Sequence, residues 1–159
     1  RTLERSKVFQ KLRASLDRAA CFYTESLVGE GNWTAVCEAV RGGEAGNRTG
    51  TFAWATALDS GVSQRVHRHP DSLVSGAYYA SAPAGAGYLQ LLDPRGPISP
   101  LFEADANFPP EPGMLLLWPA WLSHEILPSL TVDGDAGLRV SFSFSTALGG
   151  KESMEAWRL

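Results

Sequence analysis

The chain has 159 residues, of which 44% are hydrophobic and 19% are charged, and its net charge is −3. This length fits one domain that buries about two-thirds of the surface of the unfolded chain, and the composition is ordinary for a globular protein. Because the charge is slightly negative and no basic stripe is present, we expect no nucleic-acid partner. We also expect no membrane span, because no apolar run approaches the roughly 18 residues that a spanning helix needs.

The cysteines exclude two kinds of stapled fold. Cys21 and Cys37 are too few for the disulfide framework of a small secreted domain, and neither belongs to the Cys-x-x-Cys pair of a zinc knuckle. We therefore expect two thiols. The chain starts at Arg1 and not at a methionine, which leaves the compartment open, and we favour an intracellular location.

The first predicted element is an amphipathic helix over about residues 3–28. Apolar residues recur there at steps of three and four, while charged residues occupy the other side, and such a stripe packs on a core. The expected buried stripe is Val8, Leu12, Leu16, Ala19, Ala20, Tyr23 and Leu27. The glycine-rich stretch that follows, residues 29–50, reads as a connector.

From Thr51 onward the pattern changes to short strands separated by turn residues. Seven strands after one helix predict a mainly β sandwich or jelly roll. We expect a single domain over residues 1–159, with the barrel at about 51–146 and a C-terminal tail at 147–159. The proline-rich stretch 96–112 is expected to be a surface loop over one mouth of the barrel. The expected strands are Thr51–Leu58, Val62–His67, Leu73–Ala80, Gly87–Leu92, Gly113–Trp118, His124–Leu127 and Leu138–Thr146.

The only three histidines of the chain form the strongest candidate site. His67 and His69 are two residues apart, and a strand points such residues to the same face. His124 comes much later, at the start of another expected strand, and can arrive from an opposing strand. Imidazole is the commonest metal ligand, and two near ligands plus one remote ligand are typical of non-haem iron oxygenases. The sequence therefore predicts one metal site, with iron as the favoured metal.

Asp71 offers an alternative ligand, because His69-Pro70-Asp71 is a His-x-Asp pair. Residues 67 and 71 of an extended strand lie roughly 13 Å apart, so only neighbouring pairs chelate one ion easily. Pro70 lacks an N–H and suggests a turn in which Asp71 caps its own backbone. We favour His67 with His69 and keep Asp71 as the alternative.

Several stretches taken together resemble the superfamily of 2-oxoglutarate- and Fe(II)-dependent dioxygenases. The likeness covers about residues 50–146 and is nearest to the prolyl-hydroxylase-like branch and to short oxygenase-like proteins with His-x-His-Pro. The motifs lie in the family's order, although the commoner ligand pattern there is His-x-Asp. The stretches are His67-Arg68-His69-Pro70, Ser75-Gly76-Ala77-Tyr78-Tyr79, the strand and turn from Gly87 to Arg95, the run from Pro112 to Pro128, and Leu138 to Phe144.

The resemblance implies a double-stranded β-helix with the helix packed outside, and a hydroxylase that uses Fe(II) and 2-oxoglutarate. Arg139 would bind the far carboxylate of the keto-acid, since an unpaired arginine is costly in an apolar strand and a guanidinium binds carboxylates bidentately. Ser141, on the same face, adds a hydroxyl, and Tyr79 matches a further contact to this carboxylate. A structural salt bridge is the other interpretation of Arg139. Ordinary packing is expected for Tyr78, Trp118 and Trp121.

The substrate stays open between a small molecule and a peptide side chain. One rival hypothesis is a three-histidine cupin with zinc, nickel or iron and no keto-acid, which leaves Arg139 unexplained. The other is an inactive jelly-roll scaffold or a subunit of an assembly, for which a protein partner would be needed. Fold alone does not separate these functions.

Overall fold

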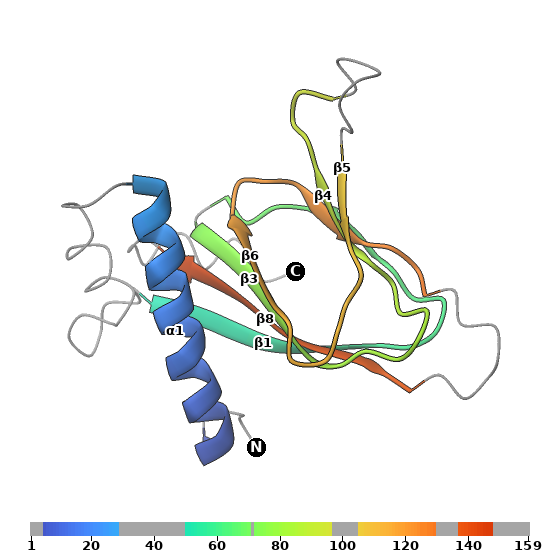
Figure 1. Ribbon diagram of the computed structural model, residues 1–159, viewed down its shortest axis with the longest axis horizontal. Coiled ribbons are helices and arrows are strands. Elements are labelled where there is room, and N and C mark those ends of the chain that lie inside the picture. Colours follow the sequence, from blue (N-terminus) through green and yellow to red (C-terminus); the bar gives the residue numbers. More distant parts are fainter. Residues whose placement is uncertain (1–4, 29–49, 71, 97–104, 130–136, 148–159) are drawn as a thin grey trace.

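The computed structural model describes residues 5–28, 50–70, 72–96, 105–129 and 137–147. In these ranges one helix precedes eight strands (Figure 1). The elements are α1 (Lys7–Val28), β1 (Gly50–Leu58), β2 (Gln64–His67), β3 (Ser72–Ser81), β4 (Leu89–Leu92), β5 (Asp105–Phe108), β6 (Leu115–Pro119), β7 (His124–Ile126) and β8 (Arg139–Ala147).

The strands form two antiparallel four-stranded sheets, in the orders β1-β8-β3-β6 and β2-β7-β4-β5. The two sheets enclose an apolar core to which both contribute, with Ala77, Tyr79 and Trp118 from one sheet and Leu89 and Ile126 from the other. Burying this surface between facing sheets is the main favourable term for such a fold. The arrangement confirms the predicted jelly roll, or double-stranded β-helix.

Helix α1 covers the outer face of the sheet that contains β1 and β8 (Figure 1). Leu16 and Ala20 pack against Phe144, and the rings of Phe9 and Phe142 are 5.7 Å apart between centroids. The predicted position outside the barrel is therefore confirmed.

The predicted buried stripe of α1 is wrong at its two ends. Val8 is 79% exposed and Leu27 is 50% exposed, whereas Phe9 and Thr24 are buried. The 3.6-residue period accommodates either Val8 or Phe9 on the inner face, and the contact with Phe142 selects the larger ring. The helix begins at Lys7, later than the predicted start.

Strand β8 separates the two layers by simple alternation. Phe142 and Phe144 point toward α1, while Arg139, Ser141 and Ser143 line a pocket between the sheets. Successive residues of a strand point to opposite faces, so the apolar residues serve the helix contact and the polar ones serve the interior.

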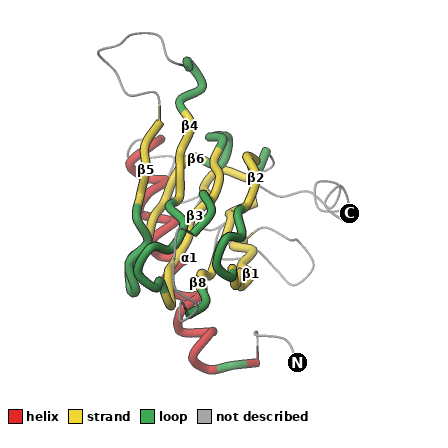
Figure 2. The backbone as a smooth tube through the Cα atoms, turned by 90° about the vertical axis from the view of Figure 1, so that its right-hand side faces the viewer, coloured by secondary structure: helices red, strands yellow, loops and turns green. Residues whose placement is uncertain are grey.

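The proline-rich stretch that was expected to be a loop contains a strand. Residues 97–104 lie outside the described residues, but Asp105–Phe108 form β5, which pairs with β4 from Leu89↔Phe108 to Leu92↔Asp105 (Figure 2). A four-residue strand at the edge of a sheet needs only one partner, and its short polar sequence before Pro109 carries little periodicity. The connector 29–49 and the tail from 148 lie outside the described residues. Ala147 belongs to β8.

Two further expectations concern the helix. No helix in the described part of the chain is long and apolar enough to cross a membrane.

Cys21 of α1 is disulfide-bonded, so the expectation of a thiol is wrong for this residue. The number of cysteines excludes a dense framework but not a single cross-link.

Gly87 permits a close approach of two backbones next to β7. A Cβ atom at this position would lie 1.7 Å from the carbonyl oxygen of Leu127, which directly follows β7. The Leu127 N–H in turn donates to the Tyr88 carbonyl, at 2.9 Å. A side chain at residue 87 would therefore displace the chain segment that carries His124.

We expect Gly87→Ala to lower the free energy of unfolding by about 1–3 kcal/mol, the usual range for overpacking. Gly137→Ala is the matched control, because a Cβ there would meet nothing within 4 Å. Urea unfolding followed by circular dichroism measures both. Equal stabilities of the two variants would contradict the close approach.

Candidate metal centre

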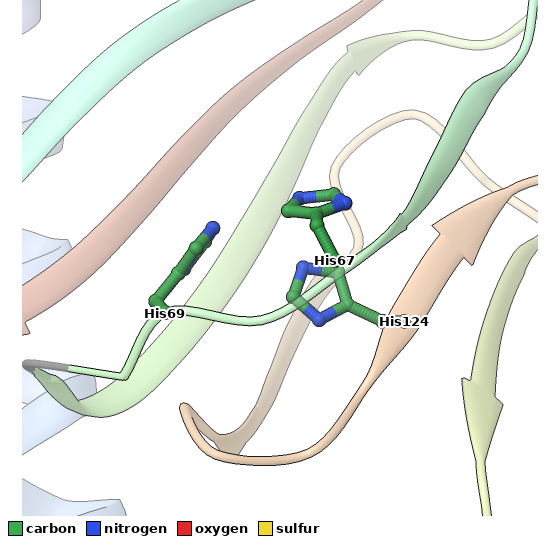
Figure 3. A group of neighbouring side chains, drawn as sticks. All are labelled: His67, His69 and His124. Carbon is green, nitrogen blue, oxygen red and sulfur yellow. The ribbon is translucent and has the colours of Figure 1, made fainter. Parts of the chain in front are cut away.

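The three histidines come together from two adjacent strands and one loop (Figure 3). His67 is the last residue of β2 and His124 is the first residue of β7, and the antiparallel register places them directly opposite each other. His69 lies in the loop after β2, where its N–H donates to the Ala120 carbonyl at 3.0 Å. The predicted opposing strand for His124 is therefore present.

The three rings are close enough to share one ion. One ligand atom from each histidine lies within 4.8 Å of the other two. The ring centroids are 4.3 Å apart for His67 and His124, 5.2 Å for His69 and His124, and 5.3 Å for His67 and His69. Nitrogen ligands about 2.0–2.1 Å from a common metal ion lie about 3 Å apart, so a small adjustment of the rings suffices.

Each Nδ1 atom already has a polar neighbour. Nδ1 of His67 lies 2.8 Å from the Arg65 carbonyl, and Nδ1 of His124 lies 3.0 Å from the Leu122 carbonyl. A carbonyl can only accept, so these contacts favour the tautomer with the proton on Nδ1 and leave Nε2 free for a metal.

His69 makes the corresponding contact with a side chain. Its Nδ1 lies 2.7 Å from Oγ of Ser75, a fully buried residue of β3. Ser75 was part of a motif that carries the family resemblance, and no role was predicted for it. Its position before the Tyr-Tyr pair carried no signal, because the contact depends on how β3 lies beside the His69 loop.

Trp118 makes a second contact with His124. Its indole Nε1 lies 3.3 Å from Nδ1 of His124, the same atom that faces the Leu122 carbonyl. Nδ1 of His124 cannot both donate to the Leu122 carbonyl and accept from the Trp118 indole. The contact with Leu122 is the shorter one, and it is compatible with metal ligation through Nε2. Trp118 packs in the core as expected, and it also fixes the position of the His124 ring.

Burial keeps two of the imidazoles neutral. Desolvation, with a smaller repulsion from His67, lowers the pKa of His69 to about 4. Desolvation also lowers the pKa of His124 to about 4, against the opposing effect of the hydrogen bond with Leu122. Metal ligation requires neutral rings, and both are neutral at pH 7.

Arg139 and Ser141 line the same pocket as the three histidines. Arg139 is only 1% exposed. Its Nη1 donates to Ser141 Oγ and its Nη2 donates to Tyr79 Oη, both at a long 3.4 Å, and its Cζ lies 4.9 Å from the centroid of the Tyr79 ring. The three residues predicted to bind the keto-acid are thus brought together.

No acidic side chain in the described part of the chain pairs with Arg139; the one ion pair there joins Arg95 and Asp93. Nε of Arg139 is buried and has no hydrogen-bond partner. Burial lowers the pKa of Arg139, and Tyr79 partly opposes this change. A buried guanidinium with weak neutral partners is costly, and an entering carboxylate would satisfy it.

Three other polar or aromatic side chains line the pocket without having been predicted. They are Trp54 from β1, Gln64 from β2 and Ser143 from β8. For Ser143 the period-two spacing after Arg139 and Ser141 was an available signal. Asp71, the alternative ligand, lies outside the described residues.

A family model described as "Putative 2OG-Fe(II) oxygenase" matches residues 52–145, which is more than half of the chain. The chain belongs to this family. The predicted family is thereby confirmed, and its description names Fe(II) and 2-oxoglutarate. The site fits both groups, because three converging imidazoles suit iron and the pocket holds a buried arginine that pairs with no acidic side chain in the described part of the chain.

The chain is also similar to solved structures at low sequence identity. A prolyl-4-hydroxylase from Pseudomonas putida is 18% identical with a TM-score of 0.50, over 87% of this chain and 81% of that chain. A 2OG-Fe(II) oxygenase family protein from Burkholderia pseudomallei is 16% identical with a TM-score of 0.47, over 64% of this chain and 47%, about half, of that chain. A cupin domain from Bordetella pertussis is 16% identical with a TM-score of 0.42, over 66% of this chain and 86% of that chain. No curated protein matches the sequence significantly.

The contact between Ser75 and His69 leads to a prediction for metal binding. We expect Ser75→Ala to weaken Fe(II) binding about 10- to 100-fold, the usual effect of removing a side chain that orients a ligand. Calorimetric titration with Fe(II) under anaerobic conditions measures the affinity. Ser143→Ala is the control, because it removes a serine that lines the pocket. Equal affinities of the two variants would show that Ser75 does not orient His69.

Proposed function

We propose that this chain hydroxylates a C–H bond of a substrate, with His67, His69 and His124 holding Fe(II). One observation carries the proposal: a buried arginine that pairs with no acidic side chain among the described residues shares a pocket with three converging imidazoles. Each feature costs folding free energy when the pocket is empty. Both costs are offset when a metal and a carboxylate bind.

The three imidazoles supply one face of the metal and leave other positions open. Their Nε2 atoms bind, because each Nδ1 has its own neighbour in the protein. Three ligands on one face with open positions suit a metal that must also bind a cosubstrate and dioxygen. Leu89, Trp118 and Ile126 form the apolar part of the wall beside these rings.

Arg139 holds the far carboxylate of 2-oxoglutarate, with Ser141 and Tyr79 as neutral partners. The guanidinium can offer the carboxylate two parallel N–H donors, and Ser141 Oγ and Tyr79 Oη already lie beside its two terminal nitrogens. Arg139 and the histidines line one pocket, so Arg139 would hold this carboxylate in the same cavity as the proposed metal ligands.

When bound, Fe(II) and 2-oxoglutarate would supply the oxidation that adds the hydroxyl group to the substrate. The protein positions both groups and restricts access to them.

The two rival functions explain less of the pocket. A cupin-type metalloenzyme uses the three histidines but gives Arg139 no role. An inactive scaffold would leave the buried guanidinium of Arg139 and two neutral histidines without a binding role. The proposal includes a small-molecule or peptide substrate, an intracellular location and, as an option, a protein assembly partner. It includes no nucleic-acid partner, in keeping with the net charge of −3.

The identity of the third ligand is tested by paired variants. If His67 binds the metal, His67→Ala should reduce bound iron to the level of His124→Ala, whereas Asp71→Ala should leave it nearly unchanged. Elemental analysis after anaerobic loading and desalting measures the bound metal. The reverse result would assign the site to His69, Asp71 and His124.

The cosubstrate site is tested with Arg139→Leu, which removes the charge and keeps similar bulk. Charge-assisted hydrogen bonds contribute about 1.5–3 kcal/mol each, and about 1.4 kcal/mol corresponds to tenfold, so affinity for 2-oxoglutarate should fall at least tenfold. Metal content should remain unchanged. Calorimetric titration of the Mn(II)-loaded protein measures the affinity.

Arg95→Leu is the control for this experiment, because it removes an exposed arginine. Equal affinity in the wild type and Arg139→Leu would remove Arg139 from the cosubstrate site. If the wild type binds the metal but no keto-acid, the cupin function replaces this proposal.

A further inference from the structure

One wall of the pocket is used by neither the metal nor the keto-acid. Trp54 of β1 lies on this wall, edge-to-face against His69, with ring centroids 5.6 Å apart and an interplanar angle of 72°. Because His69 is a proposed metal ligand, a group that approaches the metal from this side meets the Trp54 ring.

Phe52 extends the aromatic wall toward the surface. It lies two residues before Trp54 and therefore on the same face of β1, and the two ring centroids are 5.7 Å apart. This face carries Leu58 into the core at the other end of the strand. Phe52 nevertheless is 53% exposed, so a continuous line of rings leads from His69 out of the barrel.

The charge of the pocket restricts what can enter it. Apart from the three proposed metal ligands, Arg139 is the only charged side chain among the described residues that line the pocket. With Arg139 engaged by 2-oxoglutarate, none of these lining residues offers a charge to pair with a charge on the substrate. An unpaired buried charge is strongly unfavourable, whereas aromatic rings pack well on apolar groups.

We propose that Phe52 and Trp54 form the substrate-binding track of this enzyme, for an extended peptide that inserts an uncharged, apolar side chain beside the metal. Alternate side chains of an extended peptide lie about 6.6 Å apart, close to the separation of the Phe52 and Trp54 rings. Gln64 of the same pocket offers an amide that can donate to and accept from a peptide unit. A small metabolite would fill the pocket and leave Phe52 uncovered.

This inference rests on the proposed function, and one experiment separates the two. Mn(II) in the iron site relaxes the protons of any molecule bound near it, which detects weak binding. The probes are acetyl-Gly-X-Gly-amide peptides in which X is leucine, proline, aspartate or lysine, and acetyl-leucine-amide as a small-molecule probe. Each is added to protein loaded with Mn(II) and 2-oxoglutarate, with Zn(II)-loaded protein as the diamagnetic reference.

We expect the leucine and proline peptides to be relaxed more strongly than the charged peptides and than acetyl-leucine-amide. Trp54→Ala should weaken binding of the apolar peptides about tenfold, the size of a lost aromatic contact, and Trp54→Phe should restore most of it. Phe52→Ala should weaken binding of the peptides but not binding of acetyl-leucine-amide. Trp121→Ala, which removes an exposed tryptophan outside the pocket lining, should change nothing.

Equal relaxation of charged and apolar peptides would overturn the inference, as would unchanged binding in Trp54→Ala. Relaxation of acetyl-leucine-amide equal to that of the peptides would favour a small metabolite as the substrate. The protons of 2-oxoglutarate provide the internal reference. If Mn(II) relaxes them but no peptide, the track is wrong and the proposed function stands; if it does not relax them, the proposed function fails.

Discussion

The pairing of β2 with β7 is the constraint on which the site depends. Its register sets His67 opposite His124. Directly opposed residues have Cβ atoms about 4.5–5.5 Å apart, so the two rings meet without any special loop. A shift of this pairing by one residue would turn one ring to the other face of the sheet, and the three rings could no longer share one ion. Two of the three rings are therefore placed by strand pairing. His69 lies in a loop, where hydrogen bonds to Ala120 and Ser75 hold it.

The opposite sheet supplies the second half of the pocket by the same strand geometry. Every second residue of β8 faces inward, so Arg139, Ser141 and Ser143 form a polar row beneath the histidines, while Phe142 and Phe144 anchor α1. The helix does not reach the site. It covers the apolar outer face of this sheet, where Leu16 and Ala20 pack against Phe144. One strand thus serves both purposes with different residues: Phe142 and Phe144 pack on the helix, and Arg139, Ser141 and Ser143 line the pocket.

Function and stability are opposed inside this pocket. Neutral, desolvated histidines and a buried arginine that pairs with no described acidic side chain lower the stability of the protein without its ligands, and residues selected for packing alone would avoid both. The apolar core that surrounds them, including Leu89, Trp118 and Ile126, offsets this cost and also fixes the rings. Binding of metal and keto-acid converts the same groups into stabilising ones, since ligands that bind only the folded state shift the folding equilibrium.

The fold class, the order of most strands and the candidate roles of the three histidines and Arg139 could be predicted from the sequence. Period-two alternation and rare residue types are visible along the chain and carry these predictions. The sequence did not determine which side of α1 is buried, since Val8 and Phe9 fit the helical period equally and only the contact with Phe142 distinguishes them. It missed β5, which is too short to show alternation and exists because β4 offers an edge. The contacts of His69 with Ser75 and Trp54 were also beyond it. They join different strands across the barrel, and which residues meet there is decided only when the sheets curve and close.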